Sequence, residues 1–107
     1  MDIQDSLEMC KLLDTYGELL TSRQLMICKS YYFDNLSLAE VGDEFGISRQ
    51  AVNDCLEKSK KSLKKFEQVI GKIKLIEYIR ANLSDIANDS NYSQLKPKIK
   101  NILDSID

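Results

Sequence analysis

Three side chains within the stretch "ISRQAVNDCLE", residues 47–57, have the chemistry that reads the edges of DNA bases. Arg49 can donate two hydrogen bonds to guanine, and Gln50 and Asn53 can each pair with adenine. Such contacts are made from the first turns of a helix that lies in the major groove. Arg49, Gln50 and Asn53 are therefore the candidate base-reading residues of the chain.

Two carboxylates on the same exposed side count against this chemistry. Asp54 and Glu57 bring negative charge toward a polyanion, although a carboxylate can accept a hydrogen bond from cytosine. The candidates for phosphate contacts come two to four helical turns later, and they are Lys58, Lys60, Lys61 and Lys64, with Lys65 beside them. Double-stranded DNA is thus a partner that Asp54 and Glu57 disfavour. All these polar residues also fit the solvated face of an amphipathic helix, with lysine stems covering apolar surface.

The residues before this stretch predict the elements that position it. Ser37 and Glu40 have the spacing of a capping box, so a helix of about two turns begins there and runs to about residue 44. Gly46 can adopt the left-handed conformation that ends this helix, and Ser48 can cap the next one. Two helices joined this tightly form a helix-turn-helix.

The rest of the chain has helical apolar spacing as well. An N-terminal helix is predicted from one stripe, which consists of Ile3, Leu7, Cys10, Leu13 and Leu20. A second helix begins after Thr21 or Ser22. The helix from Arg49 buries five positions, which are Val52, Leu56, Ser59, Leu63 and Phe66.

The apolar series then continues to about Asn82, in one long helix that bends at Gly71 or in two stacked helices. A last short helix begins near Pro97, since proline is tolerated in a first turn. With one proline and four glycines in 107 residues, the chain is expected to be all-α and a single domain over 1–107. The helix-turn-helix core spans about 21–66, and a helical C-terminal extension spans about 67–107.

Charge and composition narrow the classes of function. Residues 1–57 carry a net charge of −7 and residues 58–80 a net charge of +6, so the positive charge is local. No secretory signal and no apolar run of membrane-spanning length is present, which predicts a cytoplasmic protein. The chain has no histidine and no nucleotide-binding loop, and none of its three cysteines lies beside a plausible base. We therefore expect no catalysis, no cofactor and no metal site.

The helix-turn-helix residues resemble region 4 of bacterial sigma factors, the module that reads the −35 promoter element. The hallmark runs are "LSLAEVG" at residues 36–42 and "FGISRQAV" at residues 45–52. Over its full length the chain is similar to the YlxM-like family of small bacterial proteins, in its N-terminal helix, its "ISRQAV" start and its lysine-rich continuation. That resemblance implies a regulatory role in the signal recognition particle pathway, with the particle's protein or RNA as partner.

Two functions remain open at this point. One is a regulatory binding protein of the signal recognition particle pathway on a helix-turn-helix scaffold, and the alternative is a sequence-specific DNA-binding transcriptional regulator. A homodimer is a further expectation, because Phe66, Val69, Ile73 and Ile76 have the 3.5–3.6 residue period of a helical seam. Packing of the same stripe against the chain's own first and last helices explains it equally well.

Overall fold

The computed structural model describes residues 3–106, and this range contains helices and turns but no strand. Its elements confirm the all-α class and the helix-turn-helix. Residues 1–71 and residues 72–107 form two compact units. The first unit holds the helix-turn-helix, and the second holds the C-terminal helices.

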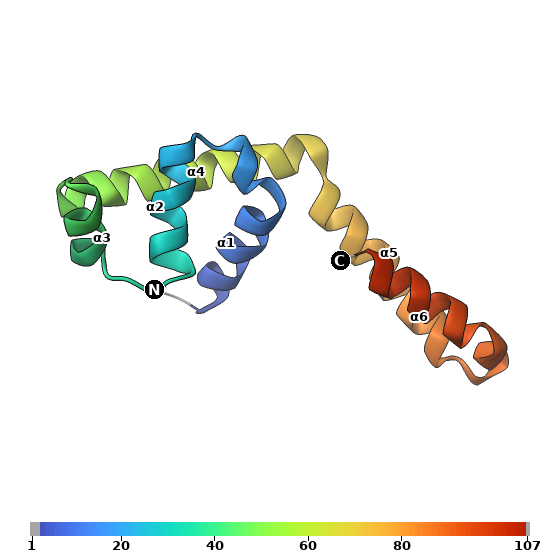
Figure 1. Cartoon of the computed structure of the whole chain (residues 1–107). Helices are drawn as coiled ribbons and strands as arrows, with labels where there is room; N and C mark the ends of the chain where they lie inside the picture. The colour runs from blue at the N-terminus through green and yellow to red at the C-terminus, as the bar shows by residue number, and fades with distance from the viewer. Residues whose placement is uncertain (1–2, 107) are drawn as a thin grey trace. The chain divides into compact units, whose positions relative to one another are not determined.

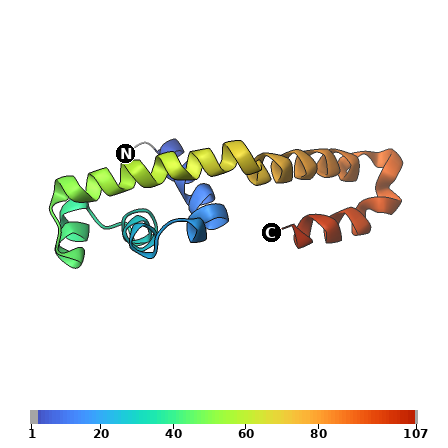
Figure 2. The ribbon, with the colours of Figure 1, turned by 90° about the horizontal axis from the view of Figure 1, so that it is seen from above.

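The described residues of unit 1 form four α-helices and one short 3₁₀ helix. They are α1 (Ile3–Tyr16), η1 (Gly17–Leu19), α2 (Ser22–Tyr32), α3 (Leu38–Phe45) and α4 (Arg49–Ile70). The three shorter α-helices lie along one side of α4, and each of them contacts it (Figures 1 and 2). The long helix therefore serves as the support on which the rest of the unit is built.

The core of unit 1 lies between α4 and these three helices. Each helix contributes side chains that are at least nine-tenths buried, and the apolar ones are Met9, Leu12, Leu13, Tyr16, Leu20, Ile27, Cys28, Val41, Val52, Leu56 and Leu63. Burial of a large aliphatic side chain contributes about 1.5–3 kcal/mol, so this cluster is the main source of the unit's stability. Ser59 is buried among them, and its Oγ has no hydrogen-bond partner in the described range.

Side-chain caps explain where three of these helices begin. Thr21 caps α2 and Ser37 caps α3, each in a complete capping box with the residue three positions later. In the second box, Glu40 N–H donates to Ser37 Oγ (3.1 Å) and Ser37 N–H donates to Glu40 Oε1 (3.0 Å). The Ser48 hydroxyl accepts from the amide of Ala51 at 3.0 Å and so starts α4.

The tight turn between α3 and α4 depends on two glycines. Gly46 has a φ of +68°, in the left-handed region, and thereby ends α3 as the sequence predicts. The amides of Gly46 and Ile47 both donate to the carbonyl of Gly42. A Cβ at Gly42 would lie 2.7 Å from the Ile47 carbonyl oxygen, so the turn closes directly over this glycine.

The predicted stripe of the first helix is wrong in part. Ile3 and Leu7 are exposed, with 78% and 57% of their surface accessible, whereas Met9, Leu12 and Tyr16 join Leu13 in the core. Both sets have helical spacing, so periodicity alone could not choose between two overlapping stripes. On α4, Phe66 is half-buried and the other four expected positions are buried.

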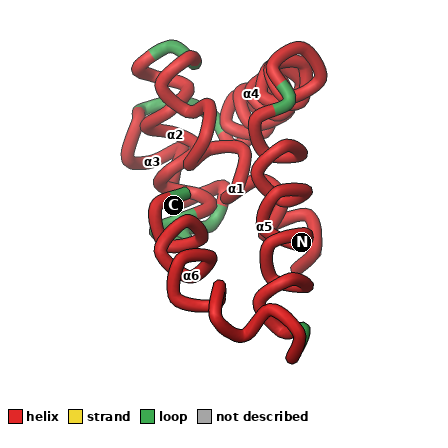
Figure 3. Tube along the Cα trace, turned by 90° about the vertical axis from the view of Figure 1, so that its right-hand side faces the viewer, coloured by secondary structure: helices red, strands yellow, loops and turns green. Residues whose placement is uncertain are grey.

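Unit 2 is a helical hairpin. It consists of α5 (Lys72–Asn88), the 3₁₀ helix η2 (Ser90–Leu95) and α6 (Lys96–Ser105), and α5 and α6 lie side by side (Figure 3). Pro97 stands in the first turn of α6, as expected. Ile99 is the one buried residue in its described part.

One predicted helix end is corrected. The helix α5 continues to Asn88 rather than ending near Asn82, because the polar residues that follow include no glycine or proline to stop it. The helix α4 ends at Ile70, where Gly71 has a φ of +68°. None of the described helices is long and apolar enough to cross a membrane.

Candidate functional site

The three candidate base-reading residues lie at the exposed start of α4, directly after the cap at Ser48. Arg49 and Asn53 form no ion pair or hydrogen bond through their side chains within the described range. The Gln50 side chain differs, because its amide Nε2 donates to Asp54 Oδ1 at 3.0 Å. Gln50 would have to give up this bond in order to reach a base.

The predicted nucleic-acid residues divide between two sides of α4, because each residue is turned by about 100° from the one before it. One side runs toward α1 and α2 and carries Arg49, Asn53, Lys60 and Lys64. The other side faces away from the core and carries Gln50, Asp54, Lys58, Lys61 and Lys65, all exposed. The last three of these residues are called the outer lysines below.

Two of the predicted phosphate-binding lysines are paired with acids of α1. Lys60 Nζ lies 2.5 Å from Asp5 Oδ1, and Lys64 Nζ lies 3.8 Å from Glu8 Oε1. The hydrogen bond that Lys60 donates to Asp5 raises the pKa of Lys60 above its usual value. A phosphate that approached either lysine would have to compete with a carboxylate that is already in place.

The outer lysines have no such partner. Lys58, Lys61 and Lys65 follow each other at spacings of three and four, and they form no ion pair with any described residue. They therefore make a short positive stripe on the solvent side of α4. Asp54 continues the same side toward the helix start, where the stripe turns negative.

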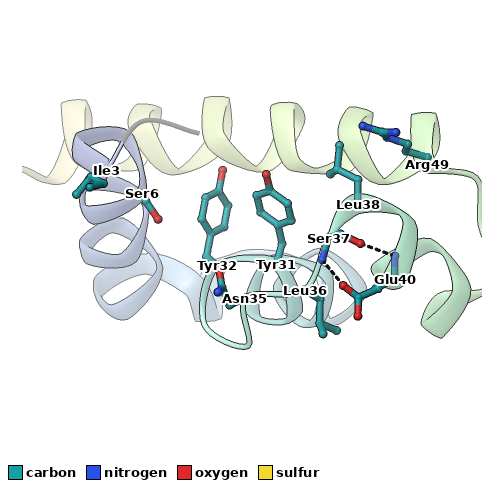
Figure 4. A pocket seen from close by; sticks show the side chains of 10 residues that line it. All are labelled: Ile3, Ser6, Tyr31, Tyr32, Asn35, Leu36, Ser37, Leu38, Glu40 and Arg49. Atoms are coloured by element: carbon teal, nitrogen blue, oxygen red, sulfur yellow. Dashed lines mark hydrogen bonds between the residues drawn. The ribbon is translucent and has the colours of Figure 1, made fainter.

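A groove of about 530 Å³ lies beside the start of α4 (Figure 4). The loop between α2 and α3 forms its floor, and its lining includes Ile3 from α1 and Arg49 from α4. The side chains of Tyr31 and Tyr32 extend from the end of α2 toward α4 (Figure 4). Their rings meet edge to face, with centroids 5.0 Å apart.

A second hollow of about 250 Å³ shares both tyrosines and Leu38 with this groove, and Asn53, Glu57, Asp5 and Lys60 also line it. Burial raises the pKa of the Tyr32 phenol, and the neighbouring carboxylates of Asp5 and Glu57 raise it further. The phenol therefore stays neutral and can donate a hydrogen bond. Asn53 thus borders a hollow in which the one cation, Lys60, is already paired with Asp5.

The four residues predicted for self-association do not share one environment. In unit 1 the Phe66 ring packs against Tyr16, with centroids 6.3 Å apart, while Val69 is 77% exposed. In unit 2 Ile73 and Ile76 are half-buried. Phe66 thereby contributes to the packing of α1 against α4.

Sequence reasoning missed the acids of α1 and the paired tyrosines of α2. Asp5 and Lys60 are 55 positions apart, and local periodicity carries no signal for such a pair. The adjacent Tyr31 and Tyr32 were visible in the sequence, but only the fold shows that both line a hollow beside Asn53. Asp5 and Glu8 of α1 therefore add to the negative charge that Asp54 and Glu57 place near the candidate base-reading residues.

The similarity of this chain to known proteins covers its whole length. A protein-family model described as "Putative helix-turn-helix protein, YlxM / p13 like", the UPF0122 family, matches residues 3–105. The chain belongs to the UPF0122 family. UPF0122 proteins of Streptococcus pyogenes serotype M5 (strain Manfredo) and serotype M49 (strain NZ131) are each 39% identical to it over 113 aligned positions. The alignments cover all of this chain and 95% of each relative.

Membership of the UPF0122 family confirms the resemblance to YlxM-like proteins. The α3–α4 pair has the form of a helix-turn-helix, in agreement with the family description. A helix-turn-helix family suggests nucleic-acid binding, and the family is not described as one of enzymes. The likeness to sigma region 4 and the connection to the signal recognition particle belong to the resemblance alone.

Proposed function

We propose that this UPF0122-family chain is a cytoplasmic regulatory protein that acts in the signal recognition particle pathway by binding, on a helix-turn-helix scaffold. Its site would be the outer lysines of α4, which offer a positive stripe to the particle's RNA or to an acidic face of its protein. The observation that carries the proposal is the division of charge on α4. The lysines on the same side of α4 as Arg49 and Asn53 are paired with Asp5 and Glu8, whereas the outer lysines are unpaired within the described range.

The assignment to the signal recognition particle pathway rests on the resemblance to YlxM-like proteins. The geometry supports only the proposed contact, which is made through the outer lysines. Phosphate neutralisation supplies most of the affinity of a DNA reader, so paired lysines and the carboxylates of Asp5, Asp54 and Glu57 weaken groove binding. A helix-turn-helix that binds DNA weakly can still serve as a binding module for another partner, since one fold supports several functions. A binding role without base reading fits this distribution of charge.

The test compares the whole protein with two charge-matched variants in titrations against the particle's RNA and, separately, its GTPase. Lys58→Glu/Lys61→Glu/Lys65→Glu should weaken binding to the true partner by at least tenfold, since three contacts are reversed in sign. Lys96→Glu/Lys98→Glu/Lys100→Glu, which makes the same change of charge on α6, should bind as the wild type does. If neither RNA nor GTPase binds at micromolar concentration, the proposal fails.

A second candidate function is sequence-specific DNA binding through Arg49 and Asn53. One observation favours it. Both side chains are exposed and unpaired within the described range, at the start of α4, which is the second helix of the helix-turn-helix. Tight binding to one duplex, lost on Arg49→Ala or Asn53→Ala with a steep dependence on salt, would establish this function in place of the first. Weak binding that is equal for all duplexes would exclude it.

A further inference from the structure

The segment of α4 that carries the outer lysines offers no apolar anchor to a protein partner. Residues 58–65 include no aromatic, methionine or arginine side chain, and their one large apolar residue, Leu63, is fully buried. The centres of protein interfaces are enriched in aromatic, methionine and arginine side chains and depleted of lysine. An acidic protein face would therefore meet only exposed ion pairs on this stripe, and such pairs contribute little to affinity.

The same stripe has the chemistry of a phosphate contact. Lys58, Lys61 and Lys65 are exposed and form no ion pair within the described range. From the first to the last they extend about 10 Å along the helix axis, at 1.5 Å per residue. Each strand of a duplex presents a phosphate about every 3.4 Å along its axis, so the stripe matches about three phosphates. Neutralised phosphates release counterions, and this release adds affinity that a protein carboxylate does not supply.

These side chains are poorly suited to reading bases. Base edges are read mainly by arginine, asparagine, glutamine and lysine, and unpaired bases stack on aromatic rings. Of these types residues 58–65 contain lysine alone, and the deep, narrow major groove of double-helical RNA cannot be read by side chains. Asp54 and Glu57 stand one turn before Lys58 and Lys61 and end the positive stripe there. The contact is thus limited to a short run of backbone phosphates.

We infer that the outer lysines bind the backbone of double-helical RNA, through about three phosphates and without preference for base sequence. This inference rests on the proposed function, because it takes the outer lysines as the site. Of the two partners named there, it selects the particle's RNA rather than an acidic face of its GTPase.

Titration of the full chain against short RNA duplexes of two unrelated sequences tests the inference. The logarithm of the binding constant should fall against the logarithm of salt concentration with a slope of about 2 to 3, as three phosphate contacts require. Lys61→Gln should lower this slope by about 0.9 and weaken binding roughly three- to eightfold at about 0.1 M salt, because one contact is lost. Lys98→Gln is the matched control, since it makes the same change of charge at an exposed position of α6, and it should bind as the wild type does.

Equal affinity of Lys61→Gln and the wild type would overturn the outer lysines as the RNA site. A difference of more than tenfold between the two RNA sequences would overturn the backbone contact, because it would show that bases are read. Tighter binding to DNA duplexes of the same sequences would assign the stripe to DNA instead.

The particle's GTPase separates this inference from the proposed function. If the GTPase binds, Lys58→Glu/Lys61→Glu/Lys65→Glu weakens that binding and no RNA duplex binds, the proposed function stands and the inference fails. If neither RNA nor GTPase binds at micromolar concentration, both fail.

Discussion

At Gly42 the helix-turn-helix leaves no room for a side chain. The Ile47 carbonyl oxygen occupies the place that a methyl group would need, 2.7 Å from the position of a Cβ. Gly42→Ala should therefore lower the free energy of unfolding by about 1–3 kcal/mol, the usual cost of overpacking. Gly46→Ala is the comparison, with open space but a φ of +68°, and should cost about 1 kcal/mol. Urea unfolding measures both, and a Gly42→Ala protein as stable as the wild type would contradict this turn.

The Glu40 carboxylate makes the stability of the α3 capping box depend on pH. Its hydrogen bonds with the backbone and side chain of Ser37 hold the pKa of Glu40 below its usual value. A lowered folded-state pKa means that the stabilisation is complete above the unfolded-state pKa of about 4.3 and is lost as the pH falls through the folded-state value.

Glu40→Gln keeps the geometry of the capping box but replaces the carboxyl group with an amide that does not titrate. The wild type should therefore lose stability relative to this variant between neutral pH and pH values below about 4. Thermal unfolding over that range follows the difference between the two proteins. A difference that stays constant with pH would show that the Glu40 carboxylate does not contribute to the capping box in solution.

Two acidic side chains of helix α1 neutralise two lysines of α4. Asp5 and Glu8 pair with Lys60 and Lys64, so removing both acids should release two lysines on the side of Asn53. Asp5→Asn/Glu8→Gln should therefore bind random duplex DNA more tightly than the wild type. Its dependence on salt should be steeper by up to about 1.8 in slope, which corresponds to two further phosphate contacts.

Asp14→Asn/Glu18→Gln is the matched control for this change. It removes the same two negative charges, from exposed positions in α1 and η1 that pair with no lysine in the described range. Fluorescence anisotropy over a series of salt concentrations compares the two variants. Equal gains in affinity would mean that net charge decides DNA binding, and that the contacts of α1 with α4 do not.

The elements differ in how far the sequence predicts them. The capping boxes and the left-handed Gly46 are local, so the starts of α2, α3 and α4 follow from residues a few positions apart. The sequence predicts the buried side of α1 only in part, because two apolar stripes overlap on this helix and only packing against α4 selects Met9 and Leu12. Helical spacing alone divides the candidate residues between two sides of α4, but only the contacts with α1 show that the lysines on one side are already paired.

At the scale of the whole chain, the opposite charges of its parts partly cancel through contact. In unit 1 the acids Asp5 and Glu8 meet Lys60 and Lys64 where α1 lies against α4. What remains accessible on α4 is the short stripe of Lys58, Lys61 and Lys65. A partner is therefore met by a local positive surface on a protein of net charge −2, which favours contact with a limited anionic patch over a long polyanion.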